Sequence, residues 1–169
     1  VCRRVFGIVA ISRAAVCEKD IDDICKKAGE YLAPLLSETR TFKVETRRSD
    51  KQFPLTSPQI SSEVGGYLSD LFPHLKPQMD APQVTVKVEV REEYAFVSGG
   101  VIPGAGGLPT GTSGRGMLLL SGGIDSPAAG WMMAKRGLEL GAVHFFSYPY
   151  TSMEAKQKVL DLAAVLAQW

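Results

Sequence analysis

Hydrophobic and polar residues alternate most regularly over residues 84–90, where four valines are separated by polar side chains. A period of two predicts a β-strand with one buried face, and residues 94–98 follow closely enough to pair with it as a hairpin. Residues 42–48 alternate in the same way, which predicts a half-exposed strand. The apolar stretch at residues 5–12 predicts a further strand.

Two other stretches repeat apolar residues every three or four positions, which is the period of a helix. The first begins at Asp20 and Asp23, whose charges suit the positive end of a helix, and continues to about Leu36. The second begins at Ser57-Pro58 and ends before Pro73. Their expected buried faces are Ile21, Ile24, Cys25, Ala28, Leu32 and Leu35 in the first helix, and Ile60, Val64, Leu68 and Leu71 in the second.

The rest of the chain predicts a strand, a sharp turn, a helix and a second strand. Met117 to Leu120 form a short apolar run, as in a strand that is buried on both faces. Ser-Gly-Gly follows as a turn, Ser126 can cap the next helix with Pro127 in its first turn, and Gly137 can end that helix. With residues 141–146 as the second strand, this order predicts a parallel strand pair.

A last helix is predicted near the C-terminus. Thr151 and Glu154 have the spacing of a capping box. The apolar residues behind them recur at helical spacing, so one face of this helix should be buried: Val159, Leu162, Ala163 and Leu166.

Composition narrows the class of protein. Hydrophobic residues make up 45% of the 169 residues, and the net charge is +1, so any nucleic-acid surface must be a local patch. We expect no membrane partner, because no apolar run approaches the length of a membrane span, and we find no signal peptide. Cys2, Cys17 and Cys25 fit neither a disulfide framework nor a metal site, so a cytoplasmic location is the simplest interpretation. Cys25 lies on the expected buried face of the first helix, so it should be a buried thiol.

Residues 121–126, Ser-Gly-Gly-Ile-Asp-Ser, connect the apolar strand to its helix. A strand–turn–helix of this kind directs backbone N–H groups and the positive end of a helix at one point, which suits a phosphate. The segment has neither the lysine of a Walker loop nor the glycine spacing of a dinucleotide fingerprint. Taken alone, it is also compatible with an ordinary glycine-rich turn.

The segment resembles the pyrophosphate loop of ATP pyrophosphatases, enzymes that cleave ATP between its α- and β-phosphates and form an adenylate. The resemblance implies ATP and Mg²⁺ as cofactors, with Asp125 at the position associated with magnesium and with catalysis. His144 and Phe145 lie at the carboxyl end of the second strand, where open α/β sheets bind ligands; for His144 a ring satisfied within the fold is the alternative. The implied nucleotide contacts are Leu119, Leu120, Ser121, Gly122, Gly123, Asp125, Ser126, His144 and Phe145.

Residues 40–51 contain five basic residues against two acidic ones, a local net charge of +3. Basic side chains here can neutralise RNA phosphates, and an exposed aromatic ring beside them can stack on a base. A solvated strand face is the alternative interpretation. The candidate tRNA-binding residues are Lys43, Arg47, Arg48, Lys51 and Phe53.

Residues 42–60 resemble the THUMP domain, a tRNA-binding module of RNA-modifying enzymes. Residues 104–114, the loop at 121–127, His144-Phe145 and residues 149–152 resemble the tRNA 4-thiouridine synthetase family, in the same order and over nearly the whole chain. The implied fold class is α/β: a THUMP-like module followed by the start of a doubly wound, Rossmann-like parallel-sheet domain of the adenine nucleotide α-hydrolase type.

This resemblance implies ATP-dependent adenylation of the C4 oxygen of a tRNA uridine and its replacement by sulfur, giving 4-thiouridine. The implied sulfur donor is the persulfide of a cysteine desulfurase, and in some organisms the family also supplies sulfur for the thiamine thiazole. None of the three cysteines matches the family's sulfur-handling positions, so we expect the isolated chain to be an inactive fragment. Another adenylating synthetase and a non-catalytic tRNA-binding fragment remain alternatives, and the oligomeric state stays open, a homodimer included.

The expected domain organisation has three parts. Residues 1–100 form the THUMP-like module, with 5–12 as the last strand of a ferredoxin-like N-terminal domain. Residues 101–115 form a glycine-rich linker that is either flexible or folds over the nucleotide. Residues 116–169 form the first part of the ATP-binding domain.

Overall fold

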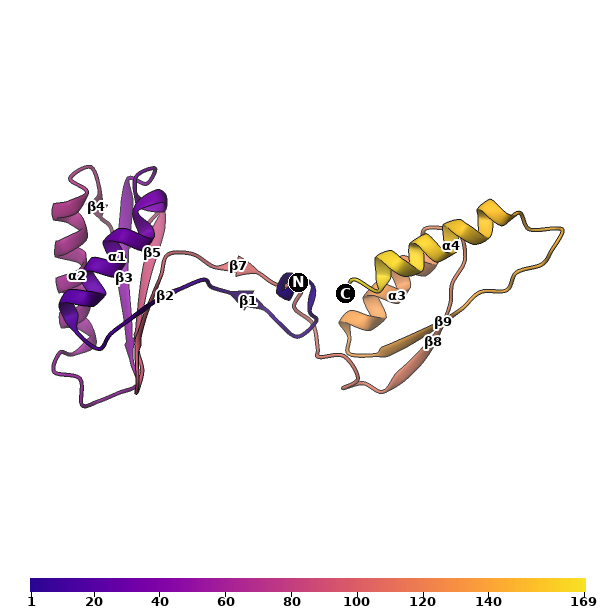
Figure 1. Ribbon diagram of the computed structural model, residues 1–169, viewed down its shortest axis with the longest axis horizontal. Helices are drawn as coiled ribbons and strands as arrows, with labels where there is room; N and C mark the ends of the chain where they lie inside the picture. The colour runs from indigo at the N-terminus through magenta and orange to yellow at the C-terminus, as the bar shows by residue number, and fades with distance from the viewer. The chain divides into compact units, whose positions relative to one another are not determined.

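The computed structural model describes residues 1–169, and the chain divides into two compact units. The central unit is Ser12–Val101, and the terminal unit combines Val1–Ile11 with Ile102–Trp169. Figure 1 shows the elements of each unit. The chain leaves the terminal unit after β1 (Ala10–Ile11) and re-enters it at β7 (Ile102–Pro103), and these two strands pair antiparallel.

The central unit contains a five-stranded mixed sheet in the order β2-β6-β5-β3-β4. Its longest strand, β3, runs parallel to both β4 and β5, while β6 runs antiparallel to β5 and β2. The hairpin that the sequence predicts is therefore β5–β6. The strand bounds are β2 Ala15–Cys17, β3 Thr41–Arg48, β4 Lys76–Pro77, β5 Val84–Val90 and β6 Ala95–Ser98.

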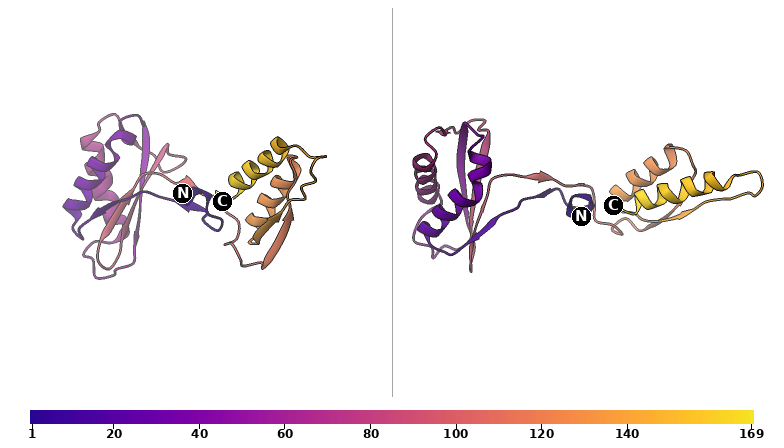
Figure 2. Two further views of the ribbon diagram at one scale, coloured as in Figure 1. Left: turned by 45° about the vertical axis from the view of Figure 1, so that its right-hand side comes forward. Right: turned by 45° about the horizontal axis from the view of Figure 1, so that its top comes forward.

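Two helices, α1 (Ile21–Leu36) and α2 (Ser57–Leu71), pack side by side against this sheet (Figures 1 and 2). The Asp20 carboxylate accepts hydrogen bonds from the first free N–H groups of α1. Thr56 and Gln59 form a capping box at α2, so this helix is capped one residue earlier than the sequence predicts. Apolar residues from both helices and from four strands make one continuous core.

The predicted buried faces of β5, α1 and α2 are largely confirmed. The four valines of β5 are at most 8% exposed, and Cys25 is buried. Burial raises the pKa of the Cys25 thiol to about 11, as expected for a structural rather than a reactive cysteine. The predicted burial of Leu35 and Leu71 was wrong, since they are 40% and 49% exposed at the margins of the two helices.

The predicted strand at residues 5–12 was wrong except at its end. Cys2–Arg4 form a short 3₁₀ helix, η1, and Gly7 then turns the chain with a φ of +93°. The Gly7 N–H donates to the Gly106 carbonyl at 2.9 Å, so the segment is held by a loop instead of by a sheet. Only Ala10–Ile11 are extended and paired.

The terminal unit contains a parallel pair of strands, β8 (Arg115–Leu119) and β9 (Glu139–Val143). The parallel pairing was predicted, but β9 begins and ends earlier than the strand expected at residues 141–146. They are connected by α3 (Asp125–Lys135), and α4 (Met153–Leu166) follows β9. Both helices lie on the same side of the strand pair in Figures 1 and 2. None of the four α-helices of the chain has the length and hydrophobicity needed to span a lipid bilayer.

Strand β8 is not buried on both faces, contrary to the prediction. Met117 and Leu119 are 68% and 64% exposed, because the helices cover only the opposite face of the pair. On that covered face α3 approaches closely: a Cβ added at Gly130 would lie 2.6 Å from Leu118 Cδ2.

The glycine-rich segment at residues 104–114 is held against the C-terminal end of α3. The Leu108 N–H donates to the Lys135 carbonyl at 3.0 Å, and Ser113 donates from its N–H to the Gly137 carbonyl and from its hydroxyl to the Arg136 carbonyl. A Cβ at Gly107 would lie 2.2 Å from the Lys135 carbonyl oxygen, which explains a glycine there. The segment therefore lies at the end of α3 opposite residues 121–126 and does not cover them.

Candidate nucleotide site

Residues 121–126, which we call the Ser-Gly-Gly turn, connect β8 to α3 and are closed by two serines. The Ser126 hydroxyl accepts a hydrogen bond from the Ser121 N–H at 2.9 Å and lies 3.0 Å from the Ser121 hydroxyl. The prediction that Ser126 caps the helix was wrong, because α3 begins at Asp125 and its N-cap Ile124 has no side-chain cap. Ser126 instead fixes the shape of the turn from within the first helical turn.

The backbone of this turn presents unused hydrogen-bond donors. The N–H groups of Gly122, Ile124, Asp125 and Ser126 have no acceptor in the structure. They lie at the N-terminus of an 11-residue helix, where the helix dipole adds partial positive charge. An anion such as a phosphate can therefore be bound here by several N–H groups at once.

The two glycines of the turn are not required by packing within the protein. A Cβ at Gly122 would have its nearest neighbours at 3.9 Å, and a Cβ at Gly123 would meet the Ser121 hydroxyl at 3.6 Å. Neither glycine has a positive φ. Because the fold has room for a side chain at both positions, their smallness is best explained by a ligand that approaches the backbone.

Asp125 supplies the carboxylate of the turn. It is exposed, and no group of three or more His, Cys, Asp or Glu side chains gathers around it or elsewhere in the chain. A magnesium ion usually takes one or two protein carboxylates and completes its shell with water and substrate phosphates. One carboxylate beside a turn with free N–H groups fits that donor set.

His144 follows β9 directly and faces the strand that leads into the turn. Its Nδ1 lies 2.9 Å from the Leu120 carbonyl oxygen, and the Leu120 N–H in turn donates to the Val143 carbonyl. Its Nε2 is buried and has no hydrogen-bond partner. With Nδ1–H donating to the carbonyl, Nε2 has a lone pair that can accept a proton donor from a ligand. The ring is thus only half satisfied by the fold.

The other predicted nucleotide contacts differ in their accessibility. Leu120 is 4% exposed, so it contributes packing and its backbone groups. Leu119 and Phe145 are 64% and 76% exposed, and both side chains are open to a ligand. The structure therefore brings the turn, Leu120 and His144 together. Phe145, the residue after His144, is exposed.

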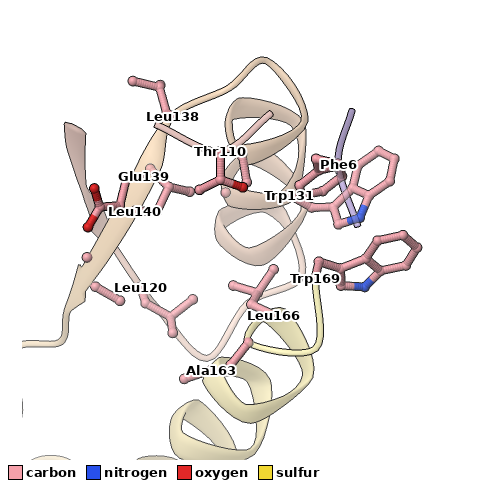
Figure 3. Close-up of a pocket in the computed structure, with 15 residues that line it drawn as sticks. Phe6, Thr110, Leu120, Trp131, Leu138, Glu139, Leu140, Ala163, Leu166 and Trp169 are labelled. Atoms are coloured by element: carbon pink, nitrogen blue, oxygen red, sulfur yellow. The ribbon is translucent and has the colours of Figure 1, made fainter. Parts of the chain in front are cut away.

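A separate apolar cavity of about 280 Å³ lies in the same unit, between α3, α4 and β9 (Figure 3). Phe6, Trp131 and Trp169 pack against one another on one wall, with ring centroids 5.5–5.8 Å apart. No residue of the Ser-Gly-Gly turn lines this cavity. Its walls are almost entirely apolar, so it does not suit a phosphate.

The basic segment of the central unit separates into two faces. Arg47 and Lys51 are exposed, and Lys43 is paired with Glu45 at 2.6 Å. The hydrogen bond from Lys43 holds the pKa of Glu45 below its usual value. These three basic side chains remain accessible to a partner.

Arg48 and Phe53 are held by the fold. The Arg48 guanidinium donates to the carbonyls of Phe53 and Leu55 at 3.0 and 2.8 Å, and Phe53 is 5% exposed within the core. The expectation of an exposed Phe53 that stacks on a base was wrong. Alternation along β3 places Arg48 on the same face as the buried Phe42, where it ties down the loop before α2.

Two family models match the chain. Residues 18–99 match the THUMP domain, and residues 111–169 match the family described as thiamine biosynthesis protein (ThiI). The first match lies within the central unit, and the second covers the Ser-Gly-Gly turn, α3, β9 and α4.

The chain is also similar to curated proteins named probable tRNA sulfurtransferase. It is 50% identical over 167 residues to the one from Thermoanaerobacter pseudethanolicus, and 46% identical over 167 residues to the one from Anoxybacillus flavithermus. These alignments cover 99% of this chain but 43% and 42% of the relatives. The chain thus spans less than half the length of these relatives.

Two solved structures resemble it closely. A crystal structure of a 4-thiouridine synthetase–RNA complex with bound ATP superposes with a TM-score of 0.92 at 36% identity, over 98% of this chain and 43% of that one. The crystal structure of PH1313 from Pyrococcus horikoshii superposes with a TM-score of 0.87 at 30% identity, over 98% of this chain and 55% of that one.

Proposed function

We propose that the chain forms the tRNA-binding module and the first part of the ATP-binding domain of an enzyme that makes 4-thiouridine in tRNA, as its similarity to proteins named probable tRNA sulfurtransferase supports. The relatives are more than twice as long as this chain, so the proposal concerns a full-length enzyme that contains it. The observation that carries the proposal is the Ser-Gly-Gly turn, whose free N–H groups and open glycines suit the phosphates of ATP.

The proposed chemistry follows from the weakness of a carbonyl oxygen as a leaving group. The uridine C4 oxygen attacks the α-phosphorus of ATP as N3 loses its proton, and pyrophosphate leaves. The adenylated C4 then carries a good leaving group, AMP, which the terminal sulfur of a persulfide displaces to give a C4–S–S link to the carrier thiol. A second thiol outside this chain then attacks the carrier sulfur, so that the S–S bond breaks, a disulfide forms between the two thiols and the terminal sulfur stays on C4 as 4-thiouridine. Cysteine desulfurase is the proposed source of that persulfide, and the same sulfur transfer to thiamine thiazole is proposed from the family match at residues 111–169.

The residues of the turn have distinct proposed roles. The N–H groups around Gly122 and Gly123 hold the departing pyrophosphate, and the two serines keep these groups in place. Asp125 would hold Mg²⁺, which would balance the phosphate charge during transfer. The buried Nε2 of His144 accepts a hydrogen bond from the nucleotide, and the exposed Phe145 offers a ring surface.

The cysteines of the chain are not proposed as sulfur carriers. Burial raises the pKa of both Cys17 and Cys25 to about 11, which leaves almost no thiolate near neutral pH. Cys2 is exposed and lies in η1, away from the Ser-Gly-Gly turn in sequence. We therefore assign the sulfur-handling thiol to a part of the enzyme outside this chain.

On the central unit, Lys43, Arg47 and Lys51 are proposed to contact the phosphate backbone of tRNA. We propose that Ser12–Val101 acts as the THUMP module, that residues 104–114 are a packed connection, and that the rest of the terminal unit opens the nucleotide domain. A tRNA-modifying role agrees with a cytoplasmic location.

The test is a thiouridine assay with the full-length enzyme, unmodified tRNA, ATP, magnesium and a persulfide-loaded desulfurase. Gly122→Ala should weaken ATP binding by about tenfold or more while tRNA binding is unchanged, because the added methyl fits the protein but would crowd a phosphate bound at the turn. Gly66→Ala on α2, where an added Cβ meets nothing within 4 Å, is the control. No thiouridine from the wild type, or equal ATP affinity in wild type and Gly122→Ala, would overturn the proposal.

Asp125→Asn keeps the size of the side chain and removes its charge. We expect this variant to bind tRNA normally and to lose most of its thiolation rate, since the carboxylate acts in the chemical step. Thiolation at the wild-type rate would reduce Asp125 to a favourable charge at the N-terminus of α3, worth ~0.3–1 kcal/mol of stability.

A further inference from the structure

The Ser-Gly-Gly turn has no basic side chain of its own, since no lysine or arginine occurs between Gly116 and Lys135. Bound ATP brings several negative charges to this point, and one of the side chains already present, Asp125, is negative. Helix N–H groups supply only about half an elementary charge. A basic side chain from elsewhere in the fold, acting together with the proposed Mg²⁺, can offset this charge beside the turn.

Helix α4 passes next to the turn and brings a lysine to it. In the direction that a side chain of Gly122 would take, the nearest atoms are Lys158 Cδ and Val159 Cγ2, each 3.9 Å from the added Cβ. Val159 is 4% exposed and holds α4 in this position. The stem of Lys158 therefore runs beside the turn, and its ammonium lies two bonds beyond this Cδ.

The ammonium of Lys158 has no partner within the protein. The carboxylates nearest to it along α4 are engaged elsewhere. Glu154 is hydrogen-bonded by its own N–H and by the Ser152 hydroxyl, which hold its pKa below the usual value, and Asp161 accepts from Gln157 at 2.9 Å.

The other basic side chains of residues 102–169 are committed to other places. Arg115 pairs with Glu139 at the far end of the strand pair, and Lys135 lies over the Trp131 ring. Arg136 follows α3 at the end opposite the turn, and Lys156 lies 5.1 Å from the centroid of the Phe146 ring. Lys158 is the one whose Cδ lies 3.9 Å from the position that a Cβ at Gly122 would take.

We propose that Lys158 binds the β- and γ-phosphates of ATP held by the Ser-Gly-Gly turn. It would do from α4 what the lysine of a Walker loop does from within the loop. When the bond between the α-phosphorus and its bridging oxygen breaks, the electron pair stays on the pyrophosphate, and the charge next to Lys158 increases. The lysine therefore stabilises the leaving group as well as bound ATP. This inference rests on the proposed function of the turn.

The test uses the full-length enzyme and compares ATP with AMP as calorimetric ligands in magnesium buffer. Lys158→Gln should raise the Kd for ATP about 10- to 100-fold, as expected for a charge-assisted hydrogen bond, and change the Kd for AMP less than about twofold. Lys156→Gln is the matched control, since it removes the same charge two residues away and should leave the ATP affinity unchanged. Lys158→Arg should recover most of the affinity.

The outcomes separate the two proposals. If the wild-type enzyme does not bind ATP, the proposed function fails, and this inference fails with it. If the wild type binds ATP but Lys158→Gln binds it equally well, or loses ATP and AMP to the same extent, only the role of Lys158 is overturned. An equal loss for Lys156→Gln would have the same meaning, because the effect would then come from the general charge of α4.

Discussion

The central and terminal units differ in how completely they bury their apolar residues. Every buried apolar residue of the chain except Phe6, Leu120 and Val159 belongs to the continuous core of the central unit. In the terminal unit Met117 and Leu119 remain mostly exposed on β8. The central unit can therefore be stabilised by its own core, whereas the terminal unit leaves one face of its strands uncovered.

This difference has a physical meaning for the candidate site. Parallel strands are normally covered by helices on both faces, and a two-stranded pair covered on one side loses much of that stabilisation. The proposed tRNA surface lies on the self-contained unit, and the proposed nucleotide site lies on the incompletely buried one. In the isolated chain we thus expect tRNA binding to persist more readily than chemistry.

The largest expected effect is a difference in hydrogen exchange within the isolated chain. Amides of β3 and β5 should require opening free energies higher by on the order of 3 kcal/mol than those of β8 and β9, because only the former belong to a closed core. The isolated chain should also produce no thiouridine. Uniformly high protection through Trp169 in the monomer, or thiolation by the chain alone, would show that the two units are equally complete.

The next effect compares one substitution in both units. Leu68→Ala removes a side chain that is 0% exposed and should lower the free energy of unfolding of the central unit by about 2–5 kcal/mol. Leu119→Ala removes a side chain that is 64% exposed and should cost less than about 1 kcal/mol in the isolated chain. Denaturant unfolding measures both, and similar losses would contradict the contrast in burial.

The smallest effect concerns the charges of the central unit. Replacing Lys43, Arg47 and Lys51 by Ala should lower the log–log salt dependence of tRNA binding by ~0.7–0.9 for each phosphate that is no longer neutralised. The expected stability change is small because these side chains are accessible. Arg48→Ala is the control: it should destabilise the unit by releasing two carbonyls and leave the salt slope unchanged. An unchanged slope in the triple variant would make this segment a solvated strand face.

The hydrophobic periodicity was sufficient to predict an element and its buried residues wherever one face of that element packs against a single core. The valines of β5 and the inward residues of α1 could be assigned because alternation and helical spacing report directly on a two-layer packing. The parallel pair β8–β9 could be predicted from the order of apolar runs and turns. The spacing of residues 121–126 alone left open whether they form a phosphate-binding loop or an ordinary glycine-rich turn. The resemblance to known families favoured the phosphate-binding loop.

The errors occurred where contacts distant in sequence decide the outcome. An apolar run cannot reveal that Gly7 will bond to Gly106, or that β8 has helices on one face only. Arg48 and Phe53 looked accessible because a basic segment suggests a surface, yet the loop before α2 folds back over them. Lys158 was missed because its position beside Gly122 depends on how α4 packs.

The short ladder between β1 and β7 gives the chain the architecture of an insertion. Ile11 pairs directly with Ile102, so the whole central unit begins and ends at neighbouring positions of one antiparallel pair. A two-residue Asn-Gly hairpin placed between Ile11 and Ile102 has the length needed to close that ladder without the intervening residues. In evolutionary terms, the central unit could be gained, lost or exchanged at this point without a change in the path of the chain through the terminal unit, which carries the Ser-Gly-Gly turn.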